Sequence, residues 1–266
     1  MDFETITVTD APGTGPAQGI RVLTLNRPGV MNAMNTRMFT EIKAAAGQLA
    51  ADASLRVLVL TGAGTKAFCT GGDLKERNGM SDETWRAQHQ LIEECFLAVK
   101  DFPVPVIAAV EGHTHAGGFE LALMCDFIVA GKGATFSLPE VKRGIMPGGG
   151  GIQNLVRTAG PRRAKQLLFT ADAFSADEAL RWNVVNDVVD TGGALAAAVE
   201  VARRIARNAP MSVRYAKLAA SRGADGDFHT GYMLDIAAYN VLVGSEDRIE
   251  GVRAFNEKRE PRWSNR

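Results

Sequence analysis

The stretch VPVIAAVEGHTHAGGFELALMCD, residues 104–126, joins an apolar run to a helix through a turn of small residues. The run over residues 104–110 predicts a buried strand, and Gly117 and Gly118 open the helix that follows. Helix-opening N–H groups lack intrahelical acceptors, glycine lets a ligand oxygen approach the backbone, and the helix dipole is positive at this end. The stretch therefore predicts a place where a developing negative oxygen is stabilised at the end of a strand.

The same order of strand, loop and helix recurs along the chain. Residues 56–61 read as a buried strand, a Gly-rich loop follows over residues 62–73, and a second Gly-rich loop, IMPGGGG, leads into another helix. This alternation predicts an α/β fold with a core over residues 1–192. The remainder, 193–266, reads as all helical and is expected to pack on the core or on a neighbouring subunit; its helices are predicted over residues 193–208, 210–221, 228–243 and 245–257.

Composition excludes several classes of protein. The 266 residues are 46% hydrophobic, and Lys+Arg and Asp+Glu are balanced at 30 each. Because there is no basic excess, we expect no nucleic-acid partner. The three cysteines have neither disulfide nor zinc spacing, which favours a reducing compartment. The N-terminus has no targeting pattern, and no apolar run is long enough for a membrane span, so we expect a cytoplasmic protein.

Two glutamates lie beside the Gly-rich loops, and neither loop carries a nucleotide-binding motif. Glu120 lies one helical turn after Gly117 and on the same face, within reach of whatever that amide holds. It is also open to a simpler interpretation, a carboxylate that complements the helix dipole. Glu140 follows Pro139 in LPEVKRGIMPGGGG, residues 138–151, and could equally be a surface loop residue.

His113 and His115 alternate on a segment expected to be extended, which points both rings to one side. Three interpretations stay open: structural packing, which we favour, a place for His115 in the wall of a pocket, or half of a metal site. Because no third ligand is apparent, we expect no metal. Cys69 is interpreted as a small buried residue rather than a nucleophile.

Taken together, FCTGGDLKE (68–76), AGGFELALMCD (116–126) and LPEVKRGIMPGGGG (138–151) resemble the crotonase (enoyl-CoA hydratase/isomerase) family. LNRPGVMNAM (25–34) and FNEKREP (255–261) are similar to the same family, so the resemblance runs from about residue 5 to residue 263. Several separate motifs in the right order make it specific.

The resemblance implies a crotonase-like ββα spiral core with a C-terminal helical trimerisation region, assembled as a trimer or a pair of trimers. It implies that Gly72 and Gly117 donate the two N–H groups of an oxyanion hole, and that Glu120 and Glu140 are the catalytic acids. Gly148 would help to place the water. Two departures from the family pattern, Ala116 for glycine and Gly72 for alanine, keep these positions small.

The resemblance also implies a coenzyme A site and an acyl pocket. The expected coenzyme A contacts are Arg27, Met31, Lys66, Thr70, Leu74 and Lys258, the last of these from the same or from a neighbouring subunit. From their positions, the expected walls of the acyl pocket are Arg77, Trp85, Phe119 and Leu138. Arg77 is open to two interpretations, contact with a carboxylated acyl chain or a solvated helix residue. No cofactor is expected, because the substrate itself carries the coenzyme A.

The function implied is an enoyl-CoA hydratase, a lyase that reversibly adds water in the syn sense across the double bond of an enoyl thioester. An isomerase or a decarboxylase on the same fold usually needs only one acid, so the presence of both Glu120 and Glu140 favours hydration. A non-catalytic protein that binds acyl-CoA is the other alternative.

Overall fold

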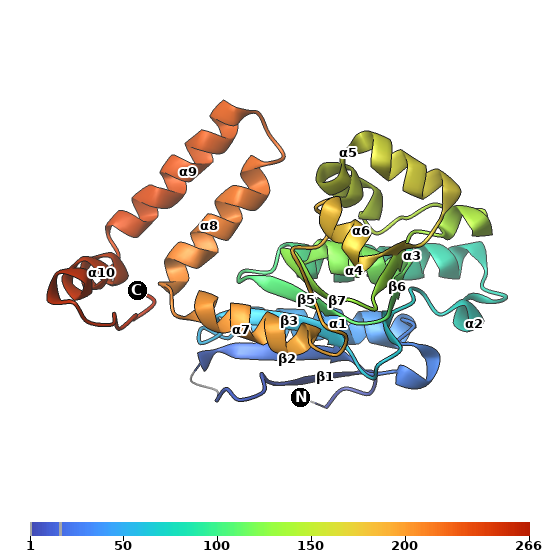
Figure 1. The fold of residues 1–266 in the computed structure, drawn as a ribbon, viewed down its shortest axis with the longest axis horizontal. Coiled ribbons are helices and arrows are strands. Elements are labelled where there is room, and N and C mark those ends of the chain that lie inside the picture. The colour runs from blue at the N-terminus through green and yellow to red at the C-terminus, as the bar shows by residue number, and fades with distance from the viewer. Residues whose placement is uncertain (1, 16–17) are drawn as a thin grey trace.

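A six-stranded sheet forms the centre of the computed structural model, which describes residues 2–15 and 18–266 (Figure 1). The strand order is β1-β2-β3-β5-β7-β10, and every neighbouring pair is parallel except β1 and β2. The apolar runs predicted as buried strands become β3 and β5. The strands are β1 (Ile6–Asp10), β2 (Ile20–Leu25), β3 (Val57–Gly62), β5 (Val106–Val110), β7 (Phe127–Gly131) and β10 (Asp187–Val189).

A second, smaller sheet has the order β4-β6-β8-β9 and lies beyond the ends of the central strands. Each of β3, β5 and β7 is followed by a short strand of this sheet and then by helical structure. This repeat is the ββα spiral that the resemblance implied. The short strands are β4 (Ala67–Cys69), β6 (His113–His115), β8 (Thr135–Ser137) and β9 (Phe174–Ser175).

Helices begin where the sequence offers capping residues. Ser81 accepts a hydrogen bond from the Thr84 N–H at the start of α3, and Ser175 and Glu178 form a capping box at the start of α6. Gly160, with φ 75°, kinks α5. The core helices are α1 (Thr36–Ala50), α2 (Leu74–Arg77), α3 (Asp82–Lys100), α4 (Gly117–Met124), α5 (Gly151–Thr170) and α6 (Ala176–Arg181), and η3 (Glu140–Arg143) is a short 3-10 helix.

Both faces of the central sheet are covered. One face packs against α1, α3 and α4 in the larger hydrophobic cluster, and the other packs against α7 (Ala194–Ala206). From Gly118 onward α4 is buried on every side, which fixes the open end of this helix at Gly117. The core therefore positions the two predicted glycine amides and Glu120 rigidly.

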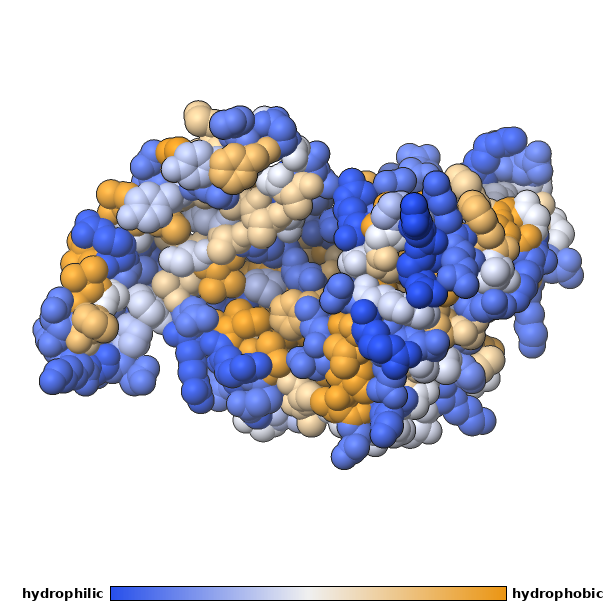
Figure 2. Space-filling view, turned by 45° about the horizontal axis from the view of Figure 1, so that its top comes forward, coloured by the Kyte–Doolittle hydropathy of each residue, from blue (hydrophilic) through white to orange (hydrophobic). Residues whose placement is uncertain are grey.

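The C-terminal region does not behave as one unit. The predicted boundary near residue 192 precedes α7, which buries Ala198 and Ala202 against the central sheet and so packs on the core, one of the two expected placements. The helices α8 (Pro210–Gly223), α9 (Phe228–Val243) and α10 (Glu246–Glu257) project away from it (Figure 1). Apolar side chains are visible along this arm (Figure 2), and Phe228 is 78% exposed.

Within residues 2–15 and 18–266, no helix has the length and apolar character needed to cross a membrane.

Candidate active site

One large cavity of about 790 Å³ lies between the second sheet, α2, α3, α4 and η3. It receives both predicted catalytic glutamates and both predicted oxyanion glycines. Its lining is Met31, Met34, Phe39, Thr70, Gly72, Leu74, Arg77, Trp85, Arg86, His89, Gln90, Ile92, Glu93, Phe96, His115, Ala116, Gly117, Glu120, Pro139, Glu140, Arg143, Ile145, Met146, Gly148 and Gly149.

The amides of Gly72 and Gly117 lie side by side in the cavity wall. Met34 donates to the carbonyl of Gly71 and accepts from the N–H of Asp73. Since N–H groups alternate sides along extended chain, the N–H of Gly72 points away from Met34. In the described part of the chain, neither this N–H nor that of Gly117 donates to a protein acceptor.

The close approach of the two loops requires glycine at residue 71. Gly71 has φ +96°, and a Cβ built on it would lie 3.0 Å from the amide nitrogen of Gly117. A Cβ on Gly117 would lie 3.8 Å from the amide nitrogen of Gly72. Two free donors therefore converge on one small region, as an oxyanion hole requires.

Ala116, the residue before the helix, has φ 51° and ψ −135°. This conformation favours glycine, and holding alanine in it costs about 1–3 kcal/mol. The strain is maintained because the N–H of Ala116 donates to the carbonyl of Ser137 and its carbonyl accepts from Phe119 and Glu120. The turn thus holds Gly117 at the cavity.

Glu120 is buried, and one of its oxygens is held by the second Gly-rich loop. Its Oε1 accepts from the N–H groups of Gly149 at 2.8 Å and Gly151 at 3.0 Å. Burial raises the pKa of Glu120, and the two N–H donors oppose this rise by stabilising the anion. A Cβ on Gly151 would lie 2.7 Å from Glu120 Cγ, so the loop fits closely around the carboxylate.

Glu140 has a different environment, because both of its carboxyl oxygens are buried without a hydrogen-bond partner in the described residues. Burial, together with the nearby charge of Glu120, raises the pKa of Glu140 to about 7. An unsatisfied buried carboxyl is costly when ionised. Glu140 is therefore the group of the pair that more readily holds a proton near neutral pH.

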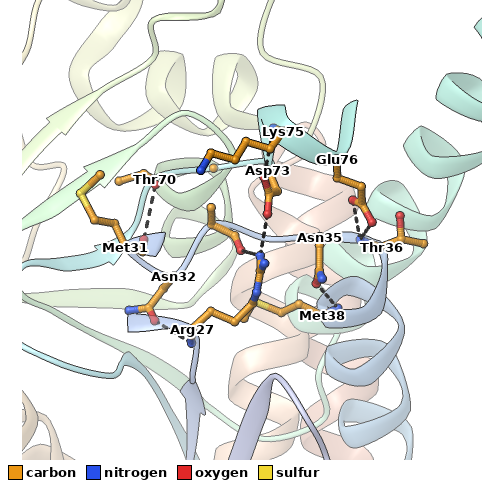
Figure 3. Close-up of polar contacts among 12 residues, drawn as sticks. Arg27, Met31, Asn32, Asn35, Thr36, Met38, Thr70, Asp73, Lys75 and Glu76 are labelled. Atoms are coloured by element: carbon orange, nitrogen blue, oxygen red, sulfur yellow. Dashed lines mark hydrogen bonds and ion pairs between the residues drawn. The ribbon is translucent and has the colours of Figure 1, made fainter. Parts of the chain in front are cut away.

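The predicted coenzyme A contacts divide into two sets. Met31, Thr70 and Leu74 line the cavity, and the Thr70 hydroxyl donates to the Met31 carbonyl at 3.4 Å. Arg27 does not line the cavity. Its guanidinium instead pairs with Asp73 at 2.9 Å and donates to the Ala33 carbonyl at 2.5 Å (Figure 3).

The two predicted lysines also lie outside the cavity lining. Lys66 is exposed in the loop between β3 and β4, and Lys258 is exposed at the left-handed C-cap of α10, on the projecting arm. Within this single chain, the structure does not bring Arg27, Lys66 or Lys258 to the site.

The acyl-pocket prediction needs correction at two residues. Arg77 and Trp85 line the cavity, whereas Phe119 and Leu138 are buried elsewhere. Phe119 follows Gly118 on a helix that is buried all round, and its ring packs against Phe136 with centroids 5.2 Å apart. Because neighbouring helical residues point in different directions, Phe119 cannot face the cavity that Glu120 faces.

The cavity also contains side chains that the sequence did not single out as site residues. Met34, Phe39 and His89 line it, as do Ile92 and Phe96. Ile92 and Phe96 lie four residues apart in α3, the spacing of one helix face, so their spacing was a usable signal. A Cβ on Gly148 would lie 2.7 Å from the His89 ring, which places this glycine against α3; its role in placing water stays a prediction.

The two neighbouring histidines share one partner. His113 Nδ1 lies 3.1 Å from Thr135 Oγ1, and His115 Nε2 lies 3.2 Å from the same oxygen. His115 both packs in this way and lines the cavity, so two of the three interpretations hold together. Burial lowers the pKa of His115. The described residues contain no group of three or more side chains suited to a metal ion.

Comparison with known proteins agrees with this geometry. A family model described as enoyl-CoA hydratase/isomerase matches residues 15–266. A crotonyl-CoA hydratase of Syntrophomonas wolfei is 40% identical over 90% of this chain and 92% of its own length. A short-chain-enoyl-CoA hydratase of Clostridium acetobutylicum is 39% identical over the same shares.

Solved structures of other proteins are also similar to this chain in fold and sequence. The crystal structure of an enoyl-CoA hydratase from Bacillus anthracis superposes with a TM-score of 0.95 at 39% identity, covering 99% of this chain and all of the other. The fold expected from the sequence is thereby confirmed. The chain belongs to the enoyl-CoA hydratase/isomerase family, also called the crotonase family.

Proposed function

We propose that this protein is an enoyl-CoA hydratase that reversibly adds water across the double bond of an enoyl-CoA thioester in the syn sense. The observation that carries the proposal is the convergence of two free amides, at Gly72 and Gly117, with two buried carboxyl groups, on Glu120 and Glu140, in one cavity. Family membership and the hydratases among its relatives support the same reaction class.

The two amides would hold the thioester oxygen. When water attacks the β-carbon of the enoyl group, electrons move through the α-carbon onto this oxygen, and an enolate-like state forms. Fixed donors stabilise the developing charge without reorganisation, and losing one such donor typically lowers the rate about 10²–10³-fold. The N–H groups of Gly72 and Gly117 have no competing protein acceptor among the described residues.

The two glutamates would handle the protons. Glu120, whose anion is stabilised by two N–H groups, accepts a proton from the attacking water. Glu140, whose unpartnered carboxyl favours the neutral form, gives a proton to the α-carbon. The water oxygen ends on the β-carbon, and one proton passes from Glu120 to Glu140 to restore the starting state. Each of these assisted proton transfers typically raises the reaction rate roughly 10²–10⁴-fold.

Assembly would complete the coenzyme A site. We propose a homotrimer or a dimer of trimers, in which the exposed apolar side chains of α8, α9 and α10 pack on neighbouring chains. Lys258 of one chain would then contact the coenzyme A bound by another, which explains why it lies far from the cavity of its own chain. No resident cofactor is required, since the substrate carries the activating thioester.

The proposal is tested by adding crotonyl-CoA and a panel of short, branched and aromatic enoyl-CoA esters and following the absorbance of the conjugated thioester. We expect the band to decrease, and Glu120→Gln and Glu140→Gln each to slow it about 10²–10⁴-fold. Glu94→Gln is the control, because Glu94 is exposed on α3 and pairs with Lys43. Binding without any loss of absorbance across the panel would instead indicate a non-catalytic acyl-CoA protein.

A further inference from the structure

Arg77 ends α2 and lies in the cavity wall beside the oxyanion hole. A Cβ built on Gly72 would lie 3.2 Å from Arg77 Cζ and 3.5 Å from Nη1. The guanidinium carbon also lies 4.6 Å from the centroid of the Trp85 ring, in a cation–π contact. A fixed cation is thus placed next to one of the two amides.

Among residues 2–15 and 18–266, the guanidinium is anchored by a hydrogen bond through one nitrogen only. Arg77 Nε donates to Gln88 Oε1 at 2.8 Å. Gln88 is itself 5% exposed, and its Nε2 donates to Thr36 Oγ1 at 2.8 Å and to Glu76 Oε2 at 2.9 Å. Because both ends of the Gln88 amide are engaged, its oxygen must face Arg77 and hold the guanidinium in one orientation.

No anion in the described part of the chain pairs with this cation. Neither terminal nitrogen of Arg77 donates a hydrogen bond there, and Arg77 forms no ion pair. The nearest acid in sequence, Glu76, directs its carboxylate at the Thr36 N–H, 2.9 Å away (Figure 3). Burial lowers the pKa of Arg77, and the charge of Glu76 opposes this only in part. A half-buried guanidinium with two free donor groups is a ready partner for a carboxylate.

The place of Arg77 decides which anion of the substrate can reach it. If the thioester oxygen is held at Gly72, the phosphates of coenzyme A are separated from this point by the whole pantetheine arm. An anion that contacts Arg77 must then lie on the acyl group, a few carbons from the thioester. A neutral acyl chain would leave this half-buried cation without an anionic partner, which is unfavourable.

We propose that the preferred substrate is a short enoyl-CoA whose acyl chain ends in a carboxylate, and that Arg77 binds this carboxylate through its two terminal nitrogens. This inference rests on the proposed function, which supplies the position of the thioester. Trp85 and Gln88 act as positioning residues that hold the two terminal nitrogens of the Arg77 guanidinium toward the acyl chain.

Binding tests the inference without needing turnover. The ligands are glutaryl-CoA and isoheptanoyl-CoA, in which two methyl groups replace the two carboxylate oxygens. We expect Arg77→Met to weaken glutaryl-CoA binding by about 10–100-fold, as for other hydrogen bonds to charged groups, and to change isoheptanoyl-CoA binding little. Arg77→Lys should weaken glutaryl-CoA binding less than Arg77→Met does, because lysine keeps the positive charge but lacks the two parallel N–H donors of the guanidinium. Arg157→Met, at an exposed pair on α5, is the control.

The inference is overturned if Arg77→Met weakens the binding of both ligands equally, because Arg77 would then only support the shape of the site. It is also overturned if the substitution weakens the binding of neither ligand. Turnover adds a second criterion: the wild-type enzyme should have a higher kcat/KM with glutaconyl-CoA than with crotonyl-CoA, and a preference for crotonyl-CoA contradicts the inference. If neither ester is hydrated, the proposed function fails, while the binding comparison still decides whether Arg77 recognises a carboxylate.

Discussion

Glu120 and Glu140 face the same cavity, but they have unequal partners. Glu120 receives two backbone N–H groups, whereas Glu140 receives none from the described residues. Two nearby carboxyl groups cannot both ionise easily, and the one with more donors ionises first. The inequality supports the proposed division into a base and an acid, which residue spacing left open.

Activity should therefore decline on the alkaline side. Glu140 must be protonated to deliver its proton, and burial raises its pKa to about 7. We expect kcat/KM with an enoyl-CoA to fall as the pH rises through about 7, and also to fall on the acid side, where Glu120 becomes protonated. A pH–rate profile at constant ionic strength measures both limbs, and a profile that stays flat well above pH 7 contradicts the assignment.

The same residue predicts a change in stability with pH. The folded-state pKa of Glu140, about 7, lies above its ordinary value of 4.5. The stability contributed by its neutral form is therefore fully present below about 4.5 and is lost as the pH rises through 7. Glu140→Gln keeps the side chain neutral at every pH. The unfolding free energy of this variant should therefore rise relative to that of wild type as the pH increases from about 4.5 to about 7. Denaturant unfolding at several pH values measures the difference; a constant difference would contradict the raised pKa.

Sequence patterns located the residues at the ends of elements better than those inside them. Gly117 and Glu120 follow from a turn and a helix start, which are local signals, whereas the role of Gly72 was implied by the family resemblance. Phe119 was misplaced because α4 is apolar on every face, and its sequence gives no direction for the cavity. The bond between Arg77 and Gln88 joins two helices, so no local pattern could have revealed it.

At the scale of elements, the junction of β4 with α4 holds the two loops of the site together. A Cβ on Gly118 would lie 2.2 Å from the carbonyl oxygen of Cys69, a contact that backbone atoms cannot accommodate without shifting. Cys69 also accepts a hydrogen bond at its Sγ from the Gly71 N–H. The positions of the two amides therefore depend on this one close approach.

Gly118→Ala should separate these elements. We expect a loss of about 1–3 kcal/mol or more in unfolding free energy, as for other overpacked sites, together with a loss of activity. Gly47→Ala is the matched control, because Gly47 is exposed in α1 and a Cβ there meets nothing within 4 Å; it should stabilise the protein by roughly 0.5–1 kcal/mol. Equal stability of the two variants would show that the junction has room to relax.

Most element boundaries were predictable because their signals are local. The apolar runs of β3 and β5, the cap at Ser81 and the capping box at Ser175 all act within a few residues. The helix α5 does not end at Gly160, where a glycine would favour a stop, but continues through a kink to Thr170. Packing of Ala164 and Leu167 in the core holds this second half in place, which is a tertiary effect that periodicity near Gly160 does not record.

At the scale of the whole molecule, the projecting arm has more exposed apolar surface than an isolated chain favours. Met233 is 64% exposed and Tyr239 is 69% exposed on α9. Large contiguous apolar surfaces on soluble proteins usually mark contacts with other chains. The arm is anchored to its own core through Lys217, whose Nζ lies 2.8 Å from Asp126 Oδ2 and donates to the carbonyl of Val104.

Light scattering in solution should therefore give a mass of three or six times the 28.4 kDa of one chain. Met233→Asp combined with Tyr239→Asp should lower this mass, because a buried unpaired charge is strongly unfavourable. The exposed pair Lys43 and Glu94 lies on the core and offers a control, since Glu94→Gln should leave the mass unchanged. A wild-type mass of one chain contradicts the proposed assembly.

The sharpest test of the proposed hydration is a crystal structure with a bound hydroxyacyl-CoA product. We expect the thioester oxygen to lie within hydrogen-bond distance of the amide nitrogens of both Gly72 and Gly117, and the product hydroxyl to contact the carboxyl groups of Glu120 and Glu140. A thioester bound outside this pair of amides, or a hydroxyl that contacts neither glutamate, would contradict it.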